Sequence, residues 1–136
     1  MLRRYLSLLL LLICFLSSRG AGGQTAKVVD VDEAGIRKSA IKKTLPAFPE
    51  GSRKRGSQGV AVVRLEYDGK GMVTRVDVLE APDSEIGGAI ADAVRHWTFK
   101  PSSIRGEPVN VRGKLTFYFL IDSKGTGRVQ NPKQFR

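Results

Sequence analysis

Hydrophobic and polar residues alternate along residues 60–67, and this is the clearest local pattern in the chain. The hydrophobic positions are Ala61, Val63, Leu65 and Tyr67, and the charged residues Arg64 and Glu66 separate the last three of them. A period of two predicts a strand with one buried face. Residues 68–71 are rich in glycine and predict a tight turn, after which residues 72–79 predict a second strand. The valines of the second strand do not alternate strictly, so we expect an antiparallel hairpin with a bulge in that strand.

A helical pattern comes after the hairpin. Its hydrophobic positions are Ile86, Ala89, Ile90, Ala93, Val94 and Trp97. This spacing predicts an amphipathic helix that packs one face against the sheet, and Asp83 or Ser84 can cap its N-terminus. A shorter helix is predicted over residues 32–43, with Asp32 as its N-cap and lysines near its end. Pro46 and Pro49 end that helix, since proline disfavours helical angles in the residue before it. Residues 50–59 are charged and predict a short helical turn that leads into a loop.

The remaining segments complete an α+β pattern. Residues 109–121 alternate again and predict a last strand, whereas residues 26–31 form either a stray strand or an extended segment. Residues 123–136 are basic and show no periodicity, so we expect a disordered tail. The order of these elements predicts a two-layer sandwich. In it, a three-stranded antiparallel sheet carries two helices on one face, and its other face is partly open.

The N-terminus has the order of a secretory signal peptide. Two arginines are followed by a hydrophobic run and then by small residues up to Gly23. The hydrophobic run is about 14 residues long, shorter than the roughly 20 needed to span a membrane. We therefore expect cleavage after Gly23, with 24–44 as a flank that carries the short helix, and a periplasmic location. Retention as an inner-membrane anchor facing the periplasm is the alternative.

Charge and chemistry narrow the classes of function. The only cysteine, Cys14, lies in the predicted leader, so disulfides and thiol catalysis are not expected. The formal charge of +10 falls to +7 without the three arginines of the leader. Export argues against a nucleic-acid partner and favours an acidic peptide, a cell-wall polymer or an anionic membrane surface. The alternative is that the positive charge only keeps a small domain soluble. His96 is the only histidine, and no catalytic or metal-ligating set accompanies it. We expect neither an enzyme nor a cofactor nor a metal.

Several short motifs occur in an order that resembles the TonB C-terminal domain family. They are Pro46-Ala47-Phe48-Pro49, a glycine-led strand from Gly59, Gly71-Met72-Val73 entering the next strand, Arg95-His96-Trp97-Thr98-Phe99-Lys100-Pro101 at the helix end, and Leu115-Thr116-Phe117-Tyr118-Phe119. The resemblance covers residues 45–122. It agrees with a core that contains Val63, Leu65, Ile90, Val94, Trp97, Phe99, Phe117 and Phe119.

The resemblance implies peptide binding by strand addition at the last strand, through backbone groups on an open sheet edge. The expected binding residues are Pro46, Phe48, Pro49, Val111, Arg112, Lys114, Thr116 and Tyr118. The partner would be an extended segment of an envelope protein or of an outer-membrane receptor.

One feature of the family's full-length members is missing before this domain. Only about 25 residues separate Gly20 from Leu45, and they do not form a long proline-rich spacer. We therefore expect a stand-alone binding module related to TonB-dependent transport. A short energy transducer anchored in the inner membrane, and a structural protein that pairs with itself as a homodimer, are the alternatives.

Overall fold

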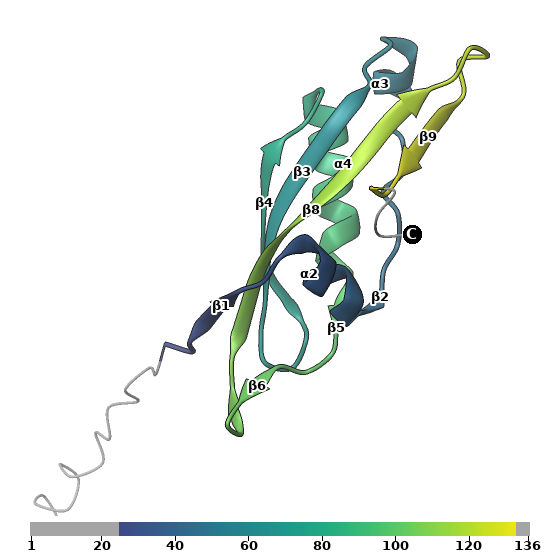
Figure 1. Cartoon of the computed structure of the whole chain (residues 1–136). Coiled ribbons are helices and arrows are strands. Elements are labelled where there is room, and N and C mark those ends of the chain that lie inside the picture. Colours follow the sequence, from purple (N-terminus) through teal and green to yellow (C-terminus); the bar gives the residue numbers. More distant parts are fainter. Residues whose placement is uncertain (1–24, 133–136) are drawn as a thin grey trace, which may run out of the picture.

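The chain folds as an α+β domain around one long, twisted sheet (Figure 1). The computed structural model describes residues 25–132, so the predicted leader and residues 133–136 lie outside the described part. The central pair of strands is β3 (Gly59–Tyr67) and β8 (Asn110–Ile121), which run antiparallel from the pair Gly59–Phe119 to the pair Tyr67–Val111.

The predicted hairpin is present. Strand β4 (Val73–Glu80) pairs antiparallel with β3, and the pairing shifts register at two places, each of which leaves one extra residue in β4. The turn before β4 is closed by Asp68, whose carboxylate accepts hydrogen bonds from the backbone N–H groups of Lys70 and Met72, both 3.0 Å. Gly71 has a φ of +87° and lies against the Phe99 carbonyl, where a side chain would collide. The two register shifts confirm the expected bulging of the second strand.

The expected sheet of three strands is wrong, because the chain adds two strands to β8. Strand β1 (Val28–Asp30) pairs with the start of β8 in parallel, and β9 (Gly127–Gln130) pairs antiparallel with its end. The sheet therefore has five strands: four in the order β1-β8-β3-β4, and β9, which lies on the same edge of β8 as β1 but at the other end of that strand. The predicted disordered tail is also wrong for residues 127–130, since this segment finds backbone partners on the edge of β8.

The helices begin where predicted but end earlier. In α2 (Glu33–Ser39) Asp32 is the N-cap, and its carboxylate accepts a hydrogen bond from the Gly35 N–H at 2.8 Å. The helix stops at Ser39 because the next residues become β2 (Ala40–Lys42), which pairs with β5 (Thr98–Phe99). The same pairing requires α4 (Ser84–Arg95) to end before Trp97.

Two short elements complete the domain. Helix α3 (Glu50–Lys54) is the predicted helical turn. Strands β6 (Ser103–Ile104) and β7 (Glu107–Pro108) form a small hairpin, and its two turn residues, Arg105 and Gly106, both have positive φ.

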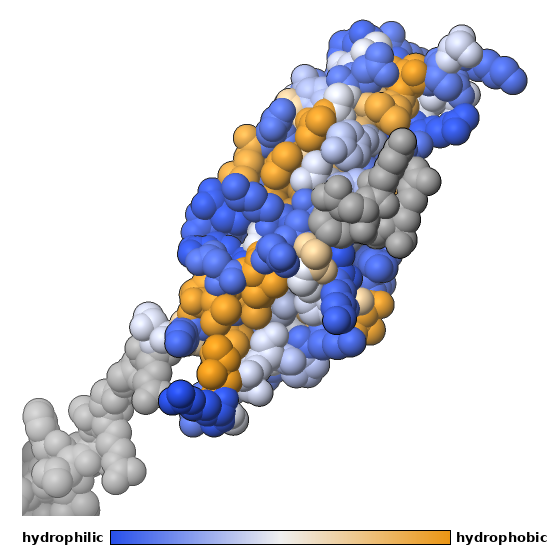
Figure 2. All heavy atoms as spheres, in the orientation of Figure 1, coloured by the Kyte–Doolittle hydropathy of each residue, from blue (hydrophilic) through white to orange (hydrophobic). Residues whose placement is uncertain are grey.

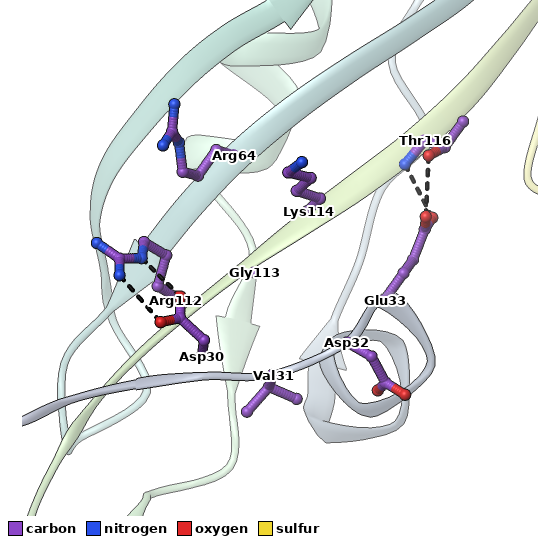
Figure 3. A pocket seen from close by; sticks show the side chains of 9 residues that line it. All are labelled: Asp30, Val31, Asp32, Glu33, Arg64, Arg112, Gly113, Lys114 and Thr116. Atoms are coloured by element: carbon purple, nitrogen blue, oxygen red, sulfur yellow. Dashed lines mark hydrogen bonds and ion pairs between the residues drawn. The ribbon is translucent and has the colours of Figure 1, made fainter.

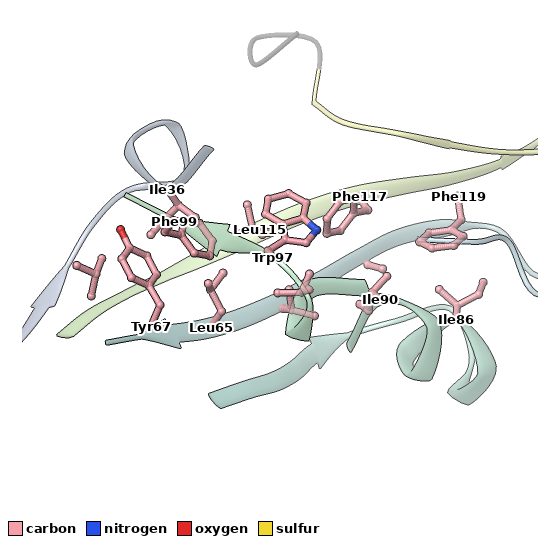
Figure 4. Packing of buried hydrophobic residues seen from close by; sticks show 14 residues of the cluster. Ile36, Leu65, Tyr67, Ile86, Ile90, Trp97, Phe99, Leu115, Phe117 and Phe119 are labelled. Carbon is pink, nitrogen blue, oxygen red and sulfur yellow. The ribbon is translucent and has the colours of Figure 1, made fainter. Parts of the chain in front are cut away.

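The hydrophobic core lies between the sheet and α4, and Ile36 of α2 joins it (Figure 4). All eight residues that the sequence placed in the core are buried. The aromatic rings contact one another: Tyr67 stacks on Phe99 with ring centres 4.1 Å apart, and Trp97 meets Phe117 edge-on at 6.2 Å. The Trp97 indole N–H donates to the Thr44 carbonyl at 3.0 Å, which ties the segment before Pro46 to the core.

Asp83 joins α3 to the N-terminus of α4. Its carboxylate caps α4 by accepting from the Ile86 N–H at 2.9 Å, and it also accepts from the buried Ser52 hydroxyl and from Arg55. The backbone hydrogen bond from Ile86 is the largest cause of a strongly lowered pKa of Asp83, with further contributions from Ser52, Ser57 and Arg55.

We expect Asp83→Ala to lower the free energy of unfolding by about 2 kcal/mol, because the helix loses its cap and Ser52 loses its acceptor. Asn caps helices nearly as well as Asp but does not titrate, so Asp83→Asn is the control for charge. A carboxyl with a lowered folded pKa stabilises the fold above its unfolded pKa of about 4 and loses that contribution as the pH falls toward the folded value. Thermal melts between pH 7 and 2 should therefore show the wild-type chain losing its advantage over Asp83→Asn below about pH 4. A constant difference across this range would contradict the role of the charge.

Candidate functional site

The outer edge of β8 is the place where the sequence predicts peptide addition, and its first part is occupied by β1. The Asn110 N–H donates to the Lys27 carbonyl at 2.9 Å, and the Val31 N–H donates to the Arg112 carbonyl at 2.8 Å. Arg112 also forms a two-pronged ion pair with Asp30, at 2.7 and 3.0 Å. This hydrogen-bonded pair holds the pKa of Asp30 below its usual value and raises the pKa of Arg112.

The middle of the same edge is occupied by two side chains of α2. One Glu33 carboxylate oxygen accepts from the Thr116 N–H at 2.8 Å, and the other accepts from the Thr116 hydroxyl at 2.9 Å. Arg37 donates to the Thr116 carbonyl at 2.6 Å and forms an ion pair with Glu33 at 2.8 Å. Both backbone groups of Thr116 are therefore bound by side chains, as a neighbouring strand would bind them.

The end of the edge is covered by β9. The turn that leads into it is closed by Asp122, whose carboxylate accepts from the N–H groups of Lys124 and Thr126, both 2.9 Å. These bonds, with that from Thr126 as the largest cause, lower the pKa of Asp122. The chain's own flanks thus cover the start, the middle and the end of this edge, and the expectation of an open edge at the last strand is wrong.

A cleft of about 580 Å³ remains between the end of β1 and α2 (Figure 3). It is lined by Asp30, Val31, Asp32, Glu33, Arg64, Arg112, Gly113, Lys114 and Thr116. In Figure 3 no hydrogen bond or ion pair joins Arg64 or Lys114 to another residue drawn, whereas Arg112 and Thr116 are bound by Asp30 and Glu33. The charge of Arg64 nevertheless helps to lower the pKa of Asp30, after the larger effect of Arg112. The cleft therefore offers two cations beside an edge that the chain has filled with its own acidic residues.

Comparison with known proteins identifies the domain that carries this edge. The family model of the Gram-negative bacterial TonB protein C-terminal region matches residues 44–121. The chain belongs to the TonB C-terminal family. The match begins after β2 and ends with β8, so β1, α2 and β9 lie outside it.

Relatives and a solved structure agree with this assignment. Protein TonB of Vibrio cholerae serotype O1 is 24% identical over 101 residues, which are 74% of this chain and 40% of the relative. Protein TonB of Xanthomonas campestris pv. campestris (strain B100) is 27% identical over 78 residues, 57% of this chain and 35% of the relative. The chain thus matches less than half the length of either relative. The solution structure of the Pseudomonas aeruginosa TonB C-terminal domain matches the fold with a TM-score of 0.51 and 23% identity, over 62% of this chain and 86% of that one.

The binding residues predicted for the TonB C-terminal domain do not lie in one place. Arg112, Lys114 and Thr116 line the cleft, and Tyr118 lies further along β8, opposite Gln130 of β9. Val111 instead points its side chain into the core, where only 4% of it is exposed.

The predicted proline segment belongs to the core side of the TonB C-terminal domain. Pro46 is buried and Pro49 is half-buried. Phe48 packs edge-on against Phe119, with ring centres 5.3 Å apart. Its ring also lies so close to Gly127 that any side chain at position 127 would collide with Phe48. This segment therefore supports β8 and β9 from the inner face.

The residues that sequence reasoning missed are Glu33, Arg37 and Asn131. Arg37 is only 6% exposed and donates to Asn131 at 2.9 Å, so α2 also holds the chain after β9. One signal was present in the sequence: Gly113 interrupts the last strand, and a glycine inside a strand often marks a close approach. A Cβ atom at Gly113 would collide with the Ile36 side chain, which is where α2 crosses.

Residues 25–132 contain neither a helix that could span a membrane nor a cluster of side chains that could hold a metal ion. No helix in this range is long and hydrophobic enough to cross a membrane. Among the same residues, no three or more histidine, cysteine, aspartate or glutamate side chains gather in a way that could hold a metal ion.

Proposed function

We propose that this chain is a non-catalytic, periplasmic, TonB-like module that binds an extended peptide of an envelope protein or outer-membrane receptor by strand addition. The match to the TonB C-terminal family supports a place in energy transduction in the cell envelope. The observation that carries the proposal is β1 itself. An extended segment from a distant part of the sequence adds in parallel to Asn110, Val111 and Arg112 of β8, and so it acts as an internal copy of the ligand.

Strand β1 is suited to be exchanged for such a ligand. It is three residues long, two of its residues are exposed, and its ion pair with Arg112 lies at the surface. Surface ion pairs contribute little to stability. An incoming peptide that carries a carboxylate could replace Asp30 at Arg112, and Arg64 and Lys114 would attract it to the cleft. The tethered β1 competes with a free peptide at an effective concentration on the order of millimolar, which lowers the apparent affinity.

The exchange can be tested by weakening β1 alone. In β1, odd-numbered residues direct their backbone groups toward β8, as the bonds of Lys27 and Val31 show. Val29→Pro therefore removes a backbone donor that faces β8, whereas Val28→Pro removes one that faces away and serves as the matched control. We expect Val29→Pro to raise the affinity for added peptide about tenfold, because the fraction of molecules with a free edge increases.

The measurement is an NMR titration of the full chain with synthetic peptides. The peptides are a copy of residues 26–32 and extended segments from the periplasmic ends of outer-membrane receptors. Binding should shift the amide signals of Asn110, Arg112, Lys114 and Thr116, and should do so at lower peptide concentration in Val29→Pro than in Val28→Pro. If no peptide shifts these signals in Val29→Pro while its melting temperature shows a folded domain, strand addition at β8 is wrong.

A further inference from the structure

Strand β4 forms the opposite edge of the sheet, and it pairs only with β3 among the strands that the structure describes. The direction of its backbone groups follows from β8. Thr116 directs its N–H and C=O away from β3. The odd-numbered residues of β8 therefore form the backbone hydrogen bonds to the odd-numbered residues of β3 that lie opposite them. The even-numbered residues of β3 face β4 instead. Arg75 and Asp77 lie opposite two of them, Glu66 and Arg64, and direct their backbone groups toward β3. Val76 and Val78 therefore direct theirs outward, to the open edge.

The sequence of this edge is complementary to itself. Between the two bulges, β4 reads Arg75-Val76-Asp77-Val78. Within one copy, Arg75 already forms an ion pair with Asp77 at 2.9 Å. An antiparallel pair of two such strands with its two-fold axis at Val76 places Arg75 of each copy opposite Asp77 of the other, so that two of these ion pairs lie side by side with opposite charges adjacent. Moving the axis by one residue in either direction places Arg75 opposite Arg75 or Asp77 opposite Asp77. Like charges directly opposite each other destabilise a sheet, so charge selects the register centred on Val76.

The surface beside this edge is hydrophobic. Val78 and Leu79 are 43% and 41% exposed, and Figure 2 shows hydrophobic surface along the β4 side of the molecule between charged side chains. Val78 lies over Gly87 of α4, where the lack of a side chain leaves a shallow groove lined also by Ala81, Gly88 and Ala91. A second copy on this edge would cover these side chains as well as pair the backbone groups.

We propose that β4 pairs with β4 of a second copy, antiparallel and centred on Val76, so that two sheets join into one. The edge of β8 stays at the far side of each copy, which leaves the peptide site proposed above accessible. The two proposals are independent, because they use opposite edges of the sheet.

Two charge reversals in the full chain test this register. Between copies, Asp77→Arg places arginine opposite arginine, and Arg75→Asp places aspartate opposite aspartate. Each change also breaks the Arg75–Asp77 ion pair within its own copy and places a like charge opposite Arg64 or Glu66 of β3, effects that mixing the two variants does not reverse. We expect each variant alone to raise the dissociation constant of the dimer by about tenfold or more. An equimolar mixture of the two variants restores opposite charges at both contacts. It should therefore form heterodimers with an affinity near that of the wild-type chain, measured by sedimentation and by energy transfer between differently labelled variants.

Matched controls distinguish an effect of strand register on dimer formation from an effect of net charge and from unfolding of the variant. Glu107→Arg and Lys124→Asp change the net charge by the same amounts at exposed sites away from β4, and both should dimerise like the wild-type chain. Melting temperatures verify that Asp77→Arg and Arg75→Asp are folded. A wild-type chain that stays monomeric up to millimolar concentration, or two folded variants whose mixture associates no better than either alone, would overturn the proposal.

Discussion

Replacing Trp97 by alanine is expected to lower the free energy of unfolding by about 4 kcal/mol, a larger effect than any other substitution proposed for this chain. The indole is 2% exposed and lies just after α4, where it contacts both Phe99 and Phe117. Its removal leaves a cavity under the centre of the sheet and frees the Thr44 carbonyl. Small domains have total stabilities of about 5–15 kcal/mol, so the variant would be close to unfolding. Urea denaturation followed by circular dichroism measures the change.

Two controls test whether packing is the cause. Trp97→Phe keeps most of the buried ring but loses the hydrogen bond, and should cost about 1–2 kcal/mol. Tyr118→Ala removes an aromatic side chain that is 36% exposed on the other face of the sheet, and should cost less than about 1 kcal/mol. Equal losses for Trp97→Ala and Tyr118→Ala would show that Trp97 is not a central packing residue.

Local patterns were sufficient to predict the centre of this fold. The alternation in β3 and the cap at Asp83 each depend on neighbours in sequence. The irregular valines of β4 predicted a bulge for the same reason, since a residue that breaks the period of two must leave the ladder. These elements carry the buried residues that decide the register of the sheet.

Strand β9 was missed although its turn repeats one that was recognised. Asp122-Ser123-Lys124-Gly125-Thr126 has the spacing of Asp68-Gly69-Lys70-Gly71-Met72, and both turns are closed by the aspartate and by a glycine with positive φ. The two turns differ in the strand that each one enters. Strand β4 contains several valines, whereas β9 is four residues long with Val129 as its only large hydrophobic residue. A strand of this kind gives no periodic signal and is recognisable only by its turn.

The cover over the candidate site could not be predicted, because its contacts join residues far apart in the chain. Glu33 and Thr116 are 83 positions apart, and on a short amphipathic helix an acid followed four residues later by an arginine is an ordinary surface pair. Only the folded chain shows that this pair binds the backbone of β8. The last strand was therefore predicted in the right part of the sequence, but the open edge expected on it is wrong, because β1, α2 and β9 cover it.

The cover also changes how the edge would work. An open edge strand invites aggregation, and natural sheets protect such edges with short strands, loops or charges. Here β1, α2 and β9 protect β8, while bulges and charged residues flank the open part of β4. A peptide at β8 must displace a competitor, whereas a partner at β4 needs only matching charges.

Arg37 is the buried charged side chain in the contact between α2 and β8. We expect Arg37→Ala to lower the free energy of unfolding by about 3 kcal/mol, since it leaves Glu33 and the Thr116 carbonyl without their buried cationic partner. The guanidinium also lies 5.3 Å from the centre of the Phe117 ring, and this contact would be lost too. Chemical denaturation measures the stability. Hydrogen exchange should show faster exchange at Thr116 and in β9, because Arg37 also holds Asn131.

A neighbour on the same helix and a double-mutant cycle test this assignment. Lys38 is exposed, so Lys38→Ala should change the stability by less than about 0.5 kcal/mol. In the cycle, Glu33→Ala and Arg37→Ala should not be additive, because once one partner is absent the other has lost its main interaction. We expect a coupling energy of about 2 kcal/mol. Losses that add within about 0.5 kcal/mol would mean that the two side chains bind β8 separately, and the α2 cover would then be two independent contacts.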